Sequence, residues 1–164
     1  MFRSQPLMTA DWHQLTAFAS GEPSLDAWLR DHAAGAEARR VSRTFVWTDQ
    51  SGAVVAYYSL AGHVLARDAV PKKLGRGSPI ETPAILLGQL ALDATLQGQR
   101  LGGALLADAL GRAVDFSRLV AARFVVVDAL HEPAAAFYQH HGFVRIPATL
   151  RLLQKVSDIE AALG

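Results

Sequence analysis

The sequence contains no cysteine among its 164 residues. This absence excludes disulfide bonds, thiolate nucleophiles and zinc sites built from cysteine ligands. Any catalysis must therefore use other side chains or the backbone.

Long apolar runs are absent as well. No run approaches the ~18 residues that a membrane-spanning helix needs, and residues 1–6 lack the apolar stretch of a signal peptide. We therefore expect a cytoplasmic protein that makes no membrane contact.

An excess of charge of one sign is also missing, because 16 Lys and Arg residues are balanced by 15 Asp and Glu residues and leave a net charge of +1. A uniformly basic face that clamps a nucleic-acid duplex is therefore not implied. The apolar share of 51% and the charged share of 19% are typical of a globular protein. The length predicts a single domain, residues 1–164, with one sizeable core.

The basic residues are nevertheless concentrated at two places. The first basic cluster consists of Arg39, Arg40 and Arg43. The second basic cluster, in a segment rich in proline and glycine, consists of Lys72, Lys73 and Arg76. Two interpretations are open: a solvated surface, or a contact with an anionic or polyphosphate partner.

The spacing of apolar residues and the composition of the turns predict the secondary structure. Helices are expected over residues 11–19, 25–38 and 133–140, and another begins at Leu101. Strands are expected over residues 41–47, 53–64, 84–92, 123–128, 143–146 and 149–153. Residues 49–52 have the composition of a hairpin turn. Residues 66–83 form a long polar excursion of the kind that has a binding role or is mobile.

A glycine-rich turn joins the strand over 84–92 to the helix that follows it, and it reads Gln97-Gly98-Gln99-Arg100-Leu101-Gly102-Gly103. In such a turn, several backbone N–H groups and the positive end of the helix dipole point at one spot, where a phosphate binds. The alternative interpretation is a tight connection without a ligand. The turn lacks the Lys-Ser/Thr ending of a P-loop, and its glycine spacing does not fit the GxGxxG fingerprint.

A second motif follows downstream, where His131-Glu132-Pro133-Ala134-Ala135-Ala136-Phe137-Tyr138 precedes Gly142-Phe143. Together the two motifs resemble the Gcn5-related N-acetyltransferase superfamily. That family pairs a Q/R-x-x-G-x-G/A loop, which holds the pyrophosphate of coenzyme A, with a later N-x-x-A-x-x-F/L-Y segment and a G-F pair. The resemblance covers essentially the whole chain.

Further segments resemble one branch of that superfamily, the bacterial acetyltransferase toxins of toxin-antitoxin systems. The matching residues are Phe18, Leu25-Asp26-x-Trp28-Leu29, Arg43-Thr44-Phe45-Val46, Tyr57-Tyr58-Ser59-Leu60, Leu87-Gly88-Gln89-Leu90-Ala91-Leu92-Asp93 and Val127-Asp128-Ala129.

The resemblance implies a single-domain α/β (α+β) acetyltransferase fold, in which helices flank a mixed, mostly antiparallel sheet whose splayed central strands hold acetyl-CoA. The cofactor-binding residues it implies are Leu90, Ala91, Leu92, Gln97, Gly98, Gln99, Arg100, Leu101, Gly102, Gly103, His131, Ala134 and Phe137. Two positions depart from the family pattern: Arg100 replaces the first motif glycine, and His131 replaces the usual asparagine.

Tyr138 occupies the position of the family's catalytic acid. Transfer of an acetyl group from a thioester to an amine expels a thiolate, which a phenol within hydrogen-bond reach can protonate. The alternative interpretation is an aromatic ring packed beside Phe137. The resemblance also implies that a backbone N–H near Leu92 stabilises the oxyanion.

The strand over 84–92 contains no carboxylate that could deprotonate the acceptor; it offers only Gln89, with Asp93 at its end. A lysine amine, of pKa about 10.4, needs such a base, whereas an α-amino group of about 7.7 to 8.0 is already substantially neutral. The missing carboxylate therefore favours an α-amine. The resemblance implies the α-amino group of aminoacyl-tRNA, with both basic clusters as tRNA contacts and blocked translation as the consequence.

Two alternative functions stay open: an acetyltransferase for a small-molecule amine or a protein N-terminus, and a noncatalytic module that binds acyl-CoA or RNA. Retention of Tyr138 argues against the second alternative. The resemblance further implies a ribbon-helix-helix antitoxin as partner and a homodimer. Six histidines without a ligand-spaced pair predict no metal site.

Overall fold

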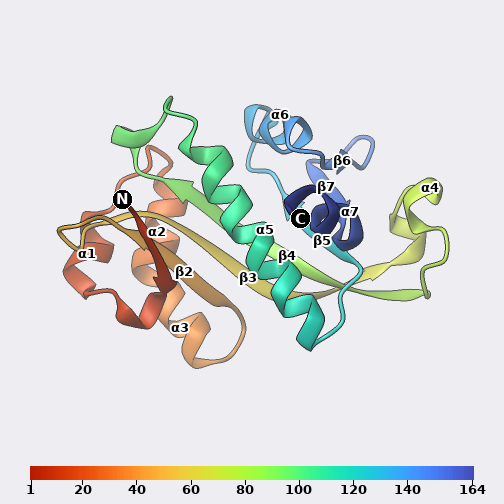
Figure 1. Cartoon of the computed structure of the whole chain (residues 1–164), viewed down its shortest axis with the longest axis horizontal. Coiled ribbons are helices and arrows are strands. Elements are labelled where there is room, and N and C mark those ends of the chain that lie inside the picture. Colours follow the sequence, from red (N-terminus) through yellow and green to blue (C-terminus); the bar gives the residue numbers. More distant parts are fainter. The chain divides into compact units, whose positions relative to one another are not determined.

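The computed structural model describes residues 1–164, except for the side chain of Thr9. Its strands are arranged in a seven-stranded sheet in the order β1-β2-β3-β4-β5-β7-β6 (Figure 1). The strands are β1 (Arg3–Pro6), β2 (Arg43–Thr48), β3 (Val54–Ala66), β4 (Glu81–Leu92), β5 (Phe124–Asp128), β6 (Val144–Arg145) and β7 (Arg151–Lys155).

The helices alternate with these strands along the chain. The α-helices are α1 (Trp12–Ala17), α2 (Pro23–Asp31), α3 (Ala33–Ala38), α4 (Lys72–Gly75), α5 (Leu101–Leu119), α6 (Glu132–His140) and α7 (Val156–Leu163). The 3-10 helices are η1 (Leu7–Thr9), η2 (Arg67–Ala69) and η3 (Ala94–Leu96). Among the described residues, no helix is both long and apolar enough to cross a membrane.

The chain divides into two compact units, and β3 and β4 contribute residues to both. The first unit contains Met1–Ala61 and Gly88–Ala109, and the second contains Gly62–Leu87 and Leu110–Gly164. The predicted mixed, mostly antiparallel sheet with flanking helices is confirmed.

In the first unit, β1 pairs antiparallel with β2, which forms a hairpin with β3. The turn of the hairpin is the predicted one, because Asp49 accepts hydrogen bonds from the backbone N–H groups of Ser51 (2.9 Å) and Ala53 (3.1 Å). The core between these strands and helices α1 to α3 consists of Leu7, Leu15, Phe18, Leu29, Ala33, Val46, Val54, Tyr57 and Ala91.

In the second unit, β4 pairs parallel with β5 over Ala84–Leu87 and Phe124–Val127. Strand β7 pairs antiparallel with both β5 and β6. The core of this unit consists of Leu65, Val70, Ala84, Phe124, Val126 and Leu153.

The helix predicted over residues 25–38 is in fact two helices. His32 separates α2 from α3 with φ −123° and ψ −26°, a conformation outside the helical region. The start differs too, because Glu22 is the N-cap of α2 and Pro23 is its first residue, so Ser24 lies inside the helix. Proline suits that first position, since its missing N–H would have no partner there.

One strand and two α-helices were not predicted from the sequence. The short edge strand β1 ends in Pro6, a residue that edge strands tolerate but that gives no strand signal. Helix α7 has no side-chain cap, and α4 is a single turn inside the polar excursion. Each of these elements depends on tertiary contacts more than on local sequence preference.

One carboxylate oxygen joins α5 to three strands. Oδ2 of Asp108 accepts hydrogen bonds from Ser4 Oγ on β1 (2.6 Å), Trp47 Nε1 on β2 (3.1 Å) and Tyr58 OH on β3 (2.8 Å). Tyr58 is fully buried and Trp47 is 8% exposed. Buried donors of this kind are expensive to leave without an acceptor.

We predict that Asp108→Ala lowers the free energy of unfolding by about 2–4 kcal/mol, because it removes the oxygen that accepts the hydrogen bonds of Trp47 Nε1 and Tyr58 OH. Asp108→Asn keeps an acceptor and should cost about 1 kcal/mol. Urea unfolding followed by circular dichroism measures both changes. The matched control is Asp115→Ala on the same helix, whose exposed ion pair with Arg118 is worth at most about 0.5 kcal/mol. A loss for Asp108→Ala no larger than for this control would contradict the role of the carboxylate.

Candidate active site

The two halves of strand β4 differ in how deeply their residues are buried. Its first half contains the buried residues Ala84, Ile85 and Leu87 and is paired with β5. The strand then continues to Leu92, with Gly88 exposed and both Leu90 and Leu92 half-buried. Of the predicted cofactor-binding residues of β4, Leu90 and Leu92 are therefore partly accessible, whereas the side chain of Ala91 is buried in the core of the first unit.

The side chain of Gln97 fixes the turn that follows β4. Its Nε2 donates hydrogen bonds to the backbone carbonyls of Leu92 (3.0 Å) and Ser20 (2.7 Å). Between these residues, Asp93 caps η3 by accepting hydrogen bonds from the N–H (3.0 Å) and Oγ1 (2.7 Å) of Thr95. The donors of the Gln97 side chain are thus used within the protein, and its contribution to a cofactor site is to hold the turn in place.

Two residues of this turn adopt left-handed backbone conformations. Gly98 has φ +80°, and a Cβ added there would meet no atom within 4 Å. Glycine is therefore favoured at this position by the backbone conformation, and not by a lack of space for a side chain. Arg100 has φ +61°, the conformation that the usual motif glycine would adopt without strain. A non-glycine residue pays about 1–2 kcal/mol for it.

The turn fits a diphosphate group. Residues 97–100 are exposed and residues 101–103 are half-buried. Leu101, Gly102 and Gly103 open the 19-residue helix α5, and the first N–H groups of a helix have no acceptor inside it. These donors and the positive end of the helix dipole favour an anion.

Helix α6 positions the second motif. His131 is its N-cap, and Nδ1 of this histidine accepts a hydrogen bond from the N–H of Ala134 (3.1 Å). Histidine therefore performs the capping that asparagine commonly performs at helix starts. Glu132 in the first turn binds both terminal nitrogens of Arg145, at 2.6 and 2.8 Å, and so attaches the helix to β6.

Tyr138 lies on the buried side of α6 and is 7% exposed. Its ring packs edge-on against Phe137 (centroids 5.3 Å apart) and Phe143 (5.6 Å). Burial raises the pKa of Tyr138 well above its usual value, so the phenol stays protonated at neutral pH. Tyr138 is thus a packed aromatic residue beside Phe137, as the alternative interpretation expected. It also has the protonation state that a general acid requires.

A polar group that the sequence analysis missed lies where β5 ends. Arg151 on β7 binds Asp128 with two hydrogen bonds, from Nε to Oδ1 (2.7 Å) and from Nη2 to Oδ2 (2.9 Å), and its Nη1 lies 3.4 Å from Nε2 of His63 on β3. The hydrogen bonds from Arg151 lower the pKa of Asp128. Burial, and then the charge of Arg151, lower the pKa of His63, which is therefore neutral at pH 7.

This group was missed because it depends on strand register. Asp128 belongs to a segment that the sequence analysis noted, but only the pairing of Asp128 with Arg151 across β5 and β7 brings the two charges together. Among the described residues, no three His, Asp or Glu side chains are placed to hold a metal ion.

In the first basic cluster, one of the three arginines is paired with a carboxylate. Nη1 of Arg43 lies 2.8 Å from Oε2 of Glu37, whose other oxygen accepts a hydrogen bond from the N–H of Thr44 (2.7 Å). Arg40, two residues beyond the end of α3, has φ +58°. All three arginines of the cluster are exposed, but Glu37 offsets part of their charge.

The second basic cluster is more open. Lys72 and Lys73 lie on α4, Arg76 follows directly, and all three are exposed. Within the described part of the chain, none of these side chains forms an ion pair. The two basic clusters belong to different compact units.

Comparison with known proteins finds a matching family model and a relative that matches nearly the whole chain. A family model described as "Acetyltransferase (GNAT) domain" matches residues 40–145. A tRNA-acetylating toxin of Mycobacterium tuberculosis (strain ATCC 25618 / H37Rv) is 40% identical over 162 residues, which are 98% of this chain and 97% of the relative.

Solved structures agree with this result. AtaT complexed with acetyl-methionyl-tRNAfMet has a TM-score of 0.87 and 26% identity, with all of both chains covered. A tyrosine-to-phenylalanine variant of the AtaT toxin, bound to the C-terminus of the antitoxin AtaR and acetyl-CoA, has a TM-score of 0.83 and 26% identity, covering 99% of this chain and 97% of that chain. The chain therefore belongs to the GNAT family of acetyltransferases, the enzymes that transfer an acetyl group from acetyl-CoA.

Proposed function

We propose that this protein is a toxin that acetylates the α-amino group of aminoacyl-tRNA in the cytoplasm and thereby blocks translation. The observation that carries this proposal is the 40% identity, over 98% of the chain, to a tRNA-acetylating toxin. The absence of a carboxylate from residues 84–92 of β4 supports it, because an α-amine needs less help from a base than a lysine does.

The whole chain acts in this proposal as one acetyltransferase domain. Acetyl-CoA supplies the acetyl group as a thioester. Backbone N–H groups of residues 98–103 bind its pyrophosphate, and residues 90–92 pair with its amide groups. His131, Ala134 and Phe137 on and beside α6 complete the cofactor site.

Tyr138 has the role of the general acid. Its raised pKa keeps the proton on the phenol until the sulfur atom accepts it as the thiolate departs. The N–H of Leu92 polarises the acetyl carbonyl by donating a hydrogen bond to its oxygen. The free α-amine attacks in its neutral form, which is well populated near pH 8.

The partners follow from the same relatives. A similar toxin is bound to the C-terminus of its antitoxin, and we infer a ribbon-helix-helix antitoxin for this chain and a homodimer as its working form. Both basic clusters contact the tRNA, with the second contributing more because its charges are not offset.

We predict that Tyr138→Phe lowers kcat for aminoacyl-tRNA by about 10²- to 10⁴-fold, the usual contribution of a general acid. The substitution removes one hydroxyl group and hardly any volume, so calorimetry should find acetyl-CoA affinity within about twofold of wild type. Transfer of radiolabelled acetyl groups to the RNA fraction measures the rate. A kcat within twofold of wild type would remove Tyr138 from the role of acid, and no transfer by the wild-type protein would refute the tRNA substrate.

We predict that Gly102→Glu abolishes acetyl-CoA binding, because it sets a carboxylate against the pyrophosphate at the start of α5. Isothermal titration calorimetry on the folded variant measures the loss. The matched control is Gly111→Glu, the same substitution on the same helix at a place where an added Cβ meets no atom within 4 Å. Unchanged affinity in Gly102→Glu would place the cofactor elsewhere.

A further inference from the structure

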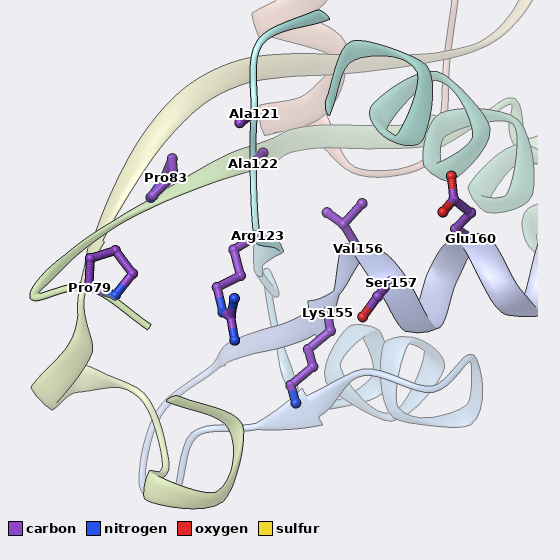
Figure 2. Close-up of a pocket in the computed structure, with 9 residues that line it drawn as sticks. All are labelled: Pro79, Pro83, Ala121, Ala122, Arg123, Lys155, Val156, Ser157 and Glu160. Carbon is purple, nitrogen blue, oxygen red and sulfur yellow. The ribbon is translucent and has the colours of Figure 1, made fainter. Parts of the chain in front are cut away.

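A cavity lies in the second compact unit, and none of its lining residues belongs to either sequence motif. It encloses about 490 Å³ and is bounded by the segment that enters β4, the connection from α5 to β5, and the junction of β7 with α7 (Figure 2). None of its lining residues belongs to the proposed acetyl-CoA site. Its polar groups therefore need a separate explanation.

Arg123 is held rigidly in the wall of this cavity. Its N–H donates to the carbonyl of Pro83 (2.8 Å), and its own carbonyl accepts from the N–H of Val156 (2.9 Å). Nη2 of its guanidinium donates to the carbonyl of Arg76 (3.2 Å). The backbone is thus fixed between β4 and α7, and the charged head is directed toward the second basic cluster.

Lys155 adds a second positive charge beside it. It is half-buried at the end of β7, opposite Phe124, and forms no side-chain hydrogen bond or ion pair among the described residues. In the view of Figure 2, the side chains of Arg123 and Lys155 both extend from the junction of β5, β7 and α7 in the same direction. Two positive charges in the lining of one cavity, without a carboxylate paired to either among the described residues, favour an anion there.

The remaining lining residues do not neutralise this pair. The carboxylate in the lining, Glu160, binds Nη2 of Arg118 at 2.6 Å. In Figure 2 it lies on the far side of α7 from the head of Lys155. Residues of the opposite wall, such as Pro79, Pro83 and Ala122, are apolar. The cavity therefore combines a cationic edge with an apolar wall, which suits a phosphate that carries a sugar and base better than it suits a small hydrated anion.

A hydrogen bond also links the wall of the cavity to the second basic cluster. The hydrogen bond from Arg123 to Arg76 attaches the cavity wall to the end of α4, where Lys72 and Lys73 are exposed. A row of separate positive charges matches the repeating phosphates of a nucleic-acid strand, each of which contributes to affinity by releasing counterions.

We propose that this cavity binds one nucleotide of the tRNA substrate, with its phosphate between Arg123 and Lys155 and its sugar or base against the proline and alanine wall. The inference rests on the proposed function, since it names a contact of the same substrate. It assigns tRNA binding to two residues that lie outside both basic clusters.

The test compares Lys155→Glu with Arg3→Glu, which makes the same change in net charge at an exposed position on edge strand β1. Acetylation of aminoacyl-tRNA is measured from 50 to 200 mM salt. A lost phosphate contact should raise the KM for tRNA about tenfold at 50 mM salt and reduce the slope of log(1/KM) against log[salt] by about 0.7–0.9. Arg3→Glu should leave both values unchanged. Arg123→Gln should match Lys155→Glu, and Lys155→Arg should restore the wild-type values.

Several outcomes would overturn the proposal. A KM and salt slope in Lys155→Glu equal to those of Arg3→Glu would show that the cavity does not contact tRNA. A changed affinity for an acidic antitoxin peptide, with the tRNA parameters intact, would assign the cavity to a protein partner. Inactivity of the wild-type protein toward aminoacyl-tRNA would instead refute the proposed function itself. Acetyl-CoA affinity, measured by calorimetry, confirms that each variant is folded.

Discussion

The proposed cofactor site depends on the two hydrogen bonds that the side chain of Gln97 donates to the carbonyls of Leu92 and Ser20. They join the end of β4, the segment before α2 and the start of the turn, so that the chain leaves the sheet in one direction only. The left-handed residues Gly98 and Arg100 then bring the backbone to the first turn of α5. Together with the backbone hydrogen bonds from Asp93 to Val55 (2.8 Å) and from Ala94 to Ala19 (2.9 Å), this anchor fixes the connection between β4 and α5.

A second constraint acts on the proposed acid. Tyr138 must be buried enough to remain protonated, yet its hydroxyl must reach the reacting sulfur atom. The histidine cap and the Glu132–Arg145 pair hold the start of α6, and Phe143 and His141 donate backbone hydrogen bonds to the carbonyl of Tyr138 at its end. The ring is therefore positioned by the whole helix and not by a hydrogen bond to its own oxygen.

The sequence predicted those features that are encoded locally. The turn at 97–103, the hairpin at 49–52 and the helix that carries Tyr138 follow from glycine spacing, turn composition and a contiguous motif. Features that depend on strand register could not be predicted, and they include the three donors around Asp108 and the pairing of Asp128 with Arg151. Arg43 illustrates the same limit, because sequence alone does not show that Glu37 offsets its charge.

The most direct test of the account is the chemical position of the transferred acetyl group. Purified protein is incubated with acetyl-CoA and aminoacylated total tRNA, a ribonuclease releases the terminal aminoacyl-adenosine, and mass spectrometry locates the acetyl group. The account predicts the acetyl group on the α-amine of the aminoacyl-adenosine and no product with uncharged tRNA. Acetylation of a nucleobase in uncharged tRNA, or of free amines alone, would contradict it.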